Sequence, residues 1–153
     1  MIDQLDKKIL EILQKDASLS LDGIGDKAGL SRNACWRRMK KLEEDGVIAR
    51  RVAILDPARV NLGLQVFIAV KVERHEAVWL DQFARAMREI PEVLGVYRIA
   101  GEMDYLVRAR VPDVTGYDAL YKKMIKRVAL SDVAANFVME EIKDLTELPL
   151  DQA

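Results

Sequence analysis

The sequence LSRNACWRRMKKLEEDGVI, residues 30–48, decides how the N-terminal part of the chain folds. It places five cations and no acid between Ser31 and Lys41, and three acids follow directly. Ser31 is a favourable N-cap residue, and the side chains of Cys35, Met39 and Leu42 recur at the spacing of one helical face. The stretch therefore predicts a helix that packs through one apolar face and carries cations on the other.

The outward face of this predicted helix combines an amide, an aromatic ring and cations. Asn33, Trp36, Arg37 and Lys40 share that face at helical spacing. Such a face fits the major groove of DNA, where an amide pairs with adenine and a guanidinium with guanine. An ordinary solvated helix fits the same pattern, so both interpretations stay open here. The role of Trp36 is also open, since its ring fits either a contact with DNA or packing against a wing that follows the helix.

Two more helices are predicted before the basic one. Asp3 caps the first, and Ser20 caps a short second helix that ends at Gly29, where the chain turns tightly. After Gly46, the β-branched run VIARRVAILD predicts a strand or short ribbon that acts as a wing. This order of elements is typical of a winged helix-turn-helix. The apolar faces of the first two helices carry Leu5, Ile9, Ile12 and Leu13, and Leu21, Ile24 and Ala28.

Composition limits the possible functions. The chain has 153 residues, half of them apolar, so it can bury a core of useful size. Its net charge of −1 excludes a general polycationic coat for nucleic acid, and any DNA contact must come from a local patch. Cys35 is the only cysteine, so an internal disulfide is impossible and a reducing cytoplasm is the expected compartment. No apolar run approaches membrane-spanning length, so we expect no membrane partner.

A second domain is predicted after a turn at Asp56-Pro57. We expect a DNA-binding domain over residues 1–50, a linker strand and turn over 51–64, and a ferredoxin-like domain over 65–153. The predicted order in that last domain is strand, helix, strand, strand, helix, strand, so the whole chain is of the α+β class. The expected elements are Gln65 to Glu73, Ala77 to Ile90, Val93 to Ala100, Asp104 to Val111, Val114 to Val128 and Ala135 to Lys143.

A four-stranded sheet with both helices on one face leaves its other face uncovered. Alternation in the first strand puts either Phe67 and Ala69, or Val66, Ile68 and Val70, on that face. Neither set is suited to water, so we expect a homodimer. A dimer would present two basic helices to two related half-sites in DNA.

The turn between the second and third predicted strands of this domain is a candidate small-molecule site. Gly101 permits a tight turn with exposed amide groups that suit a carboxylate, while Glu102 or Asp104 can accept hydrogen bonds from an ammonium group. These groups together fit a zwitterion. An ordinary hairpin turn, with Asp104 bonded to local backbone, explains the same residues and stays open.

The whole chain resembles the Lrp/AsnC family of bacterial and archaeal transcription regulators, also called feast/famine regulatory proteins. The resemblance rests on LDKKIL near the start, GLSRNACWRRMKKLEEDGVI in the predicted DNA-binding domain, and GEMDYLVRARVPD in the second domain. It implies a dimer that often builds octamers and binds an amino acid effector, without a further cofactor. It also implies site residues. The implied DNA-binding residues are Ser31, Arg32, Asn33, Trp36, Arg37, Lys40 and Lys41, and the implied effector-binding residues are Gly101, Glu102, Met103, Asp104 and Asn136.

Some residues depart from the family pattern, and other function classes compete. Gly23 and Gly25 stand inside the second helix, where glycine weakens helix formation. Asn136 lies about where relatives carry a hydroxyl residue, which bears on the identity of the effector. The same architecture resembles the sirohaem decarboxylases, but the chain has one histidine, His75, which we expect to be solvated or capping, and no paired nucleophile and base. A winged helix that binds another protein instead of DNA is a third possible function, besides the regulator and the decarboxylase.

Overall fold

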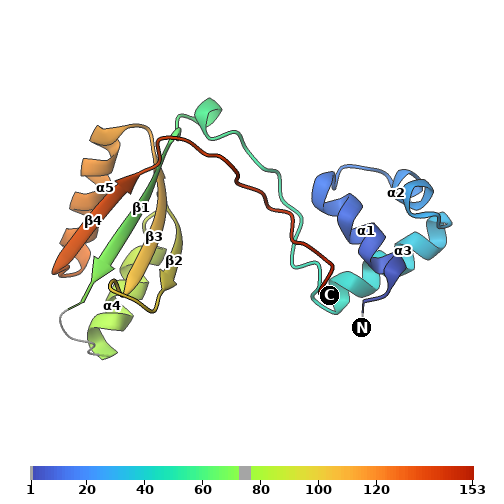
Figure 1. The fold of residues 1–153 in the computed structure, drawn as a ribbon, viewed down its shortest axis with the longest axis horizontal. Helices are drawn as coiled ribbons and strands as arrows, with labels where there is room; N and C mark the ends of the chain where they lie inside the picture. The colour runs from blue at the N-terminus through green and yellow to red at the C-terminus, as the bar shows by residue number, and fades with distance from the viewer. Residues whose placement is uncertain (1, 73–76) are drawn as a thin grey trace. The chain divides into compact units, whose positions relative to one another are not determined.

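The computed structural model describes residues 2–72 and 77–153 and divides the chain into two compact units (Figure 1). The first unit runs to Ile54 and also includes the C-terminal segment Ile142–Ala153. The second unit is Leu55–Glu141. The expected second domain, residues 65–153, therefore extends further along the sequence than the unit that the contacts define. His75 lies outside the described residues.

Three helices build the first unit, as the sequence predicts. They are α1 (Gln4–Lys15), α2 (Leu21–Ala28) and α3 (Arg32–Glu44). The carboxylate of Asp3 accepts from the backbone N–H groups of Leu5 and Asp6, and the Asp6 side chain accepts in return from the Asp3 N–H, which completes a capping box. Ser20 and Ser31 cap α2 and α3. Gly29 ends α2 with a φ of 73°, a conformation that glycine adopts without steric cost.

The core of the first unit forms where the three helices meet. The Cys35 side chain is fully buried, and its burial raises the pKa of the thiol, so this cysteine packs rather than reacts. The expected stripe of α3 is confirmed, and α1 adds Leu10, which the periodicity did not single out. The buried members of this core are Ile9, Leu10, Ile24, Ala28, Cys35, Met39 and Leu42.

The structure does not form the strand that the sequence predicts after Gly46. In the described residues no strand lies between α3 and the first strand of the second unit, and the only helical turn there is η1 (Ala58–Val60). Val52, Ile54 and Leu55 have 58%, 71% and 65% of their surface exposed. Their β-branched and apolar character favours an extended strand, but a strand needs a neighbour to pair its backbone, and none is present in the described chain.

The second unit is a four-stranded antiparallel sheet with the strand order β2-β3-β1-β4 (Figure 1). Both helices pack on the same face of the sheet, because their apolar side chains join those of β1 and β3 in one core. This is the predicted ferredoxin-like arrangement. The elements are β1 (Leu64–Lys71), α4 (Ala77–Arg88), β2 (Val93–Arg98), β3 (Tyr105–Val111), α5 (Val114–Arg127) and β4 (Asp132–Phe137).

The register of β1 resolves which side chains face the helices. Val66, Ile68 and Val70 are fully buried in the core, so Phe67 and Ala69 lie on the open face of the sheet. The last strand begins three residues earlier than predicted and ends at Phe137 instead of Lys143. Its core positions carry Val133 and Ala135, and Ala134 between them is also apolar, so the alternation is faint.

The C-terminal segment packs on the helices of the first unit. Leu150 is partly buried against their core. The Gln14 side chain binds the Leu148 backbone twice: its Nε2 donates to the Leu148 oxygen over 3.1 Å, and its Oε1 accepts from the Leu148 N–H over 2.6 Å. These contacts join residues 134 positions apart, and they lie within the first unit.

Candidate nucleic-acid interface and small-molecule site

The outward face of α3 presents the predicted side chains to solvent. Ser31, Arg32, Asn33, Arg37, Lys40 and Lys41 are exposed, and Trp36 has 49% of its surface exposed. The Lys40 ammonium lies 5.3 Å from the centroid of the Trp36 ring, a cation–π contact. Trp36 therefore packs against its own helix partner Lys40, and its ring remains accessible.

Ion pairs distinguish the cations of α3 from one another. Arg37 is exposed and forms no ion pair with any residue that the structure describes. Its charge is therefore available to a ligand without the loss of an internal contact. The other cations have partners: Arg32 binds Asp22 at 2.7 Å, Lys40 lies 3.6 Å from Glu44, and Lys41 binds Asp45 at 2.9 Å.

Arg38 has a structural role that sets it apart from its neighbours. Its guanidinium donates to Asp3 over 2.6 Å and to Asp6 over 2.8 Å, and its side chain is only 31% exposed. These pairs fasten α3 to the first turn of α1 and raise the pKa of Arg38. The Asp6 N–H, together with Arg38, lowers the pKa of Asp3. Arg38 thus orients α3, while Arg37 faces outward.

Arg51 is a cation beside this surface that the sequence analysis missed. Its guanidinium binds the Glu43 carboxylate at 2.6 Å, although eight residues separate the two. Together with Trp36 and Lys40 it lines a hollow of about 600 Å³ on the first unit. The only signal for Arg51 in the sequence is that it could pair with an acid near the end of α3. The sequence offers several such combinations of opposite charges, so this signal does not single out Arg51.

The turn at Gly101 to Asp104 connects β2 to β3 and is fastened to β1. Gly101 has a φ of 153°, where a side chain would be strained. The Asp104 N–H donates to the Val70 oxygen over 3.0 Å, and the Asp104 carboxylate accepts from the Val72 N–H over 2.8 Å. Asp104 therefore bonds to backbone that lies 32 residues away in the sequence. Glu102 is exposed, and Met103 is partly buried.

Asn136 lies apart from this turn within the chain. It stands opposite Phe67 on the β4 side of β1, and its Nδ2 donates to the Phe67 oxygen over 3.3 Å. The turn instead adjoins β3, on the other side of β1. The structure thus groups Gly101, Glu102, Met103 and Asp104 but does not bring Asn136 into contact with them.

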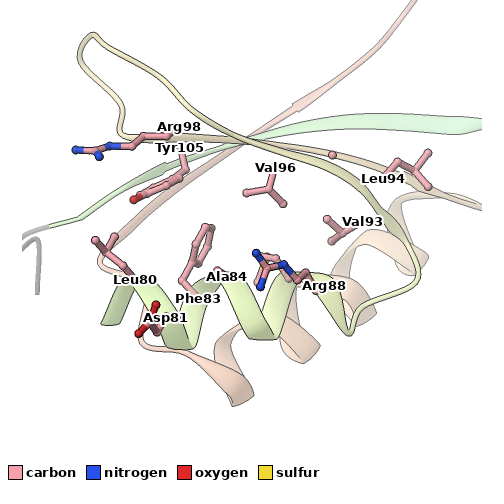
Figure 2. A pocket seen from close by; sticks show the side chains of 12 residues that line it. Leu80, Asp81, Phe83, Ala84, Arg88, Val93, Leu94, Val96, Arg98 and Tyr105 are labelled. Carbon is pink, nitrogen blue, oxygen red and sulfur yellow. The ribbon is translucent and has the colours of Figure 1, made fainter. Parts of the chain in front are cut away.

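A cavity of about 570 Å³ lies next to the turn, between α4 and the strands β2 and β3 (Figure 2). Arg98 and Tyr105, which flank the turn in sequence, line it. Asp81 and Arg88 of α4 add charges of both signs to its lining. Tyr105 also packs on Phe83, with ring centroids 4.9 Å apart. A cavity with both charge signs and aromatic walls can accommodate a small zwitterion.

Across 2–72 and 77–153, no group of three or more His, Cys, Asp or Glu side chains is arranged to hold a metal ion. No helix in those ranges is long and apolar enough to cross a membrane.

Comparison with known proteins relates both units to one family. A model of winged helix-turn-helix DNA-binding domains matches residues 2–49, and a model of the Lrp/AsnC ligand binding domain matches residues 65–148. The chain belongs to the Lrp/AsnC family. Among curated Lrp/AsnC relatives, the glutamate uptake regulatory protein of Zymomonas mobilis is 48% identical over 97% of this chain and 91% of its own length. The DNA-binding transcriptional activator DecR of Escherichia coli is 43% identical over 99% of this chain and its own full length.

Solved Lrp/AsnC structures agree with the fold. An AsnC family regulator from Agrobacterium tumefaciens matches with a TM-score of 0.94 and 50% identity, over 97% of each chain. A regulator from Neisseria meningitidis, solved as a complex with L-methionine, matches with a TM-score of 0.94 and 36% identity, over 99% of this chain and 98% of its own. This Lrp/AsnC protein is a DNA-binding transcription regulator with a helix-turn-helix unit and an α+β unit.

Proposed function

We propose that this regulator reads double-stranded operator DNA with α3 and that its DNA occupancy or assembly responds to a small amino acid. The observation that carries the first half is the difference between Arg37 and its neighbours. Arg37 is exposed on the face opposite the buried stripe of α3 and has no internal ion pair in the described structure. A guanidinium in that position suits bidentate pairing with guanine.

The remaining DNA-binding residues divide into two roles in this proposal. Asn33 pairs with adenine, whereas Arg32, Lys40 and Lys41 bind phosphates and fix the register of the helix. In the free protein, carboxylates pair with these three cations, and phosphates would compete with them. Because exposed ion pairs contribute little stability, the exchange of partners costs little free energy. Trp36 and Ser31 contact the sugar and phosphate edges of the groove.

In this proposal, the protein binds DNA as a homodimer. The open face of the sheet carries Phe67 on β1 and Tyr97 on β2, and Tyr97 is 49% exposed. A second copy of the sheet would remove this apolar surface from water and present two α3 helices together. The family resemblance extends the proposal to octamers.

The effector in this proposal binds at the turn from Gly101 to Asp104. Backbone amides of the turn receive the carboxylate, Glu102 accepts from the ammonium, and Asp104 holds the turn against β1. The complex of the Neisseria meningitidis relative with L-methionine supports an amino acid as the ligand class. In an assembled protein, Asn136 of the same or another chain can contribute to this site. An effector that binds one assembly more tightly than another shifts the population toward it.

We further propose that the chain is not an enzyme, needs no cofactor and works on chromosomal DNA in the cytoplasm, away from membranes. The competing assignment to a sirohaem decarboxylase has its own test, because a bound tetrapyrrole is coloured. Protein purified from its host should show no absorbance band in the visible range. A visible band that copurifies with the chain would favour the decarboxylase.

DNA binding by the Arg37→Ala variant tests the main proposal. Fluorescence anisotropy with the regulator's own promoter should show a loss of about 1–3 kcal/mol, roughly five- to 150-fold in Kd. The matched control is Arg59→Ala, which removes an 86% exposed cation from the second unit and should leave Kd unchanged. Wild-type binding should also weaken steeply with salt. Equal affinities for the two variants, or no preference for the promoter over random DNA, would reject the assignment of α3 as the reading helix.

A further inference from the structure

The chain that leaves α3 brings Arg51 back beside the outward face of that helix. Ile48 packs on the core of the first unit, and its backbone N–H donates to the Leu42 oxygen over 3.0 Å. This bond fixes the direction in which the chain leaves the helix. Three residues later, the Arg51 guanidinium binds the Glu43 carboxylate at 2.6 Å. Arg51 therefore has a defined position on α3, although it lies outside the helix.

This position is at one edge of the outward face. Trp36, Lys40 and Glu43 recur at i, i+4 and i+7, so they form one row along α3. Arg51 lines the hollow of about 600 Å³ together with all three. The other lining residues are apolar, and they are Leu21 and Met39. The hollow thus combines an apolar lining with two cations and one carboxylate.

The edges of a reading helix face the DNA backbone. An α-helix with its side chains is roughly 10–12 Å wide, and the major groove is about 12 Å wide, so a helix that contacts base edges fills the groove. The rows of side chains at the two edges of its outward face then lie next to the sugar–phosphate strands that border the groove. A cation held in such a row is placed to bind a phosphate.

We propose that Arg51 binds a phosphate of the DNA backbone and that Glu43 competes with the DNA for it. This inference rests on the proposed function of α3 and adds a contact from outside that helix. In the free protein the Glu43 carboxylate holds the guanidinium, and on DNA a phosphate oxygen takes its place. The two side chains are 42% and 45% exposed, so their ion pair contributes little stability and the exchange costs little free energy.

Glu43 opposes DNA binding in a second way. Its carboxylate stays at the same edge of α3 after the phosphate has taken the guanidinium, and a carboxylate beside a phosphate is a repulsive contact. Both effects act on the backbone, which has the same charge in every sequence. The pair of Arg51 and Glu43 therefore sets the sequence-independent part of the affinity, whereas Arg37 contributes to the preference for the promoter.

Fluorescence anisotropy with two duplexes, the regulator's own promoter and a scrambled sequence of equal length, tests the proposal. Arg51→Ala should weaken binding to both duplexes by the same factor, roughly five- to 20-fold. It should also reduce the slope of log Kd against log salt by about one per bound chain. Arg51→Lys should recover most of the affinity, because an ammonium group also binds phosphate. Glu43→Gln should tighten binding to both duplexes, up to about fivefold.

Arg50→Ala is the matched control for Arg51→Ala. It removes the same charge from the adjacent residue, which is exposed but does not line the hollow. We expect a change in Kd of less than about twofold and an unchanged salt slope, because a cation that does not touch phosphate acts only through screened charge. Circular dichroism and thermal unfolding should be the same for all of these variants, since every substituted side chain is exposed.

Two results would overturn the proposal. The first is an Arg51→Ala variant whose Kd and salt slope match those of Arg50→Ala. The second is weaker DNA binding by Glu43→Gln, because Glu43 would then assist the contact instead of competing with it. Arg37→Ala distinguishes this failure from that of the proposed function. If Arg37→Ala loses affinity for the promoter while Arg51→Ala binds like wild type, only the backbone contact is rejected, and if neither variant changes binding, both assignments are.

Discussion

Gly25 and Leu30 approach so closely that a β carbon on Gly25 would stand 2.7 Å from the carbonyl oxygen of Leu30. The Leu30 N–H also donates to the Gly25 oxygen over 2.8 Å, so the backbone folds back onto α2 at this point. The turn between α2 and α3 depends on this contact. A glycine that weakens the helix by its intrinsic propensity is thus required by the tight turn that follows it.

Substitution of the two glycines of α2 should have opposite effects on stability. Gly25→Ala forces the turn to shift and should lower the free energy of unfolding by about 1–3 kcal/mol. Gly23→Ala should raise it by up to about 1 kcal/mol, because the new methyl group meets only Ser20 Oγ, at 3.4 Å, and the helix gains a better former. Urea denaturation of both variants measures the difference. Equal effects would show that the turn tolerates a side chain.

The capping box should make the first unit sensitive to acid. The pKa of Asp3 is lowered in the folded state, first by the hydrogen bond from the Asp6 N–H and then by Arg38. The stabilisation is fully present above the ordinary pKa of 3.8 and is lost as pH falls through the lower folded value. Asp3→Asn keeps an N-cap of similar quality but cannot titrate.

Thermal unfolding between pH 5 and pH 2 tests this dependence. The melting temperature of wild type should fall more steeply with decreasing pH than that of Asp3→Asn, and circular dichroism at pH 7 should show equal helix content in both. If the two proteins lose stability in parallel, Asp3 does not contribute to the acid response.

Two carboxylates of the turn that we propose as the effector site, Glu102 and Asp104, should respond differently to mutation. Thermal shift against the twenty amino acids identifies the best ligand, since a ligand that binds only the folded protein raises the melting temperature. Glu102→Gln should reduce the shift and leave the unliganded melting temperature unchanged, because Glu102 is exposed. Asp104→Ala should erase the shift and also lower the unliganded value, because the bond to Val72 is lost. An undiminished shift in both variants would place the effector elsewhere.

The C-terminal segment should stabilise the helix-turn-helix unit through one side chain. Leu150 is partly buried on the core of that unit, so Leu150→Ala should cost about 1 kcal/mol. Leu148 is 71% exposed and uses only its backbone to bind Gln14, so Leu148→Ala is the matched control and should cost little. Urea denaturation of the two variants compares them. Identical midpoints would indicate that the segment does not remain docked in solution.

Sequence patterns predicted the helix ends and the apolar stripes because the interactions that produce them join residues close together in the sequence. Asp3, Ser20, Ser31 and Gly29 mark helix ends through interactions that reach only three or four residues. The stripe of α3 follows from helical periodicity in the same way. The alternation in β1 predicted a strand but could not say which face is buried, because both sets of side chains are apolar until the helices cover one of them.

Contacts between distant residues were decided only by the tertiary structure. The exposure of Arg37 and the fastening of Arg38 cannot be told apart in the sequence RR, since the difference depends on where Asp3 and Asp6 lie in space. The unpaired stretch after Gly46 has a strand-like composition and lacks only a neighbour. The bond from Asp104 to Val72, the docking of Leu150 and the pairing of Arg51 with Glu43 likewise arise from packing. The sequence by itself therefore determined the helices and strands of both units and their order, except in the stretch after Gly46, and the packing determined which side chains remain free to bind.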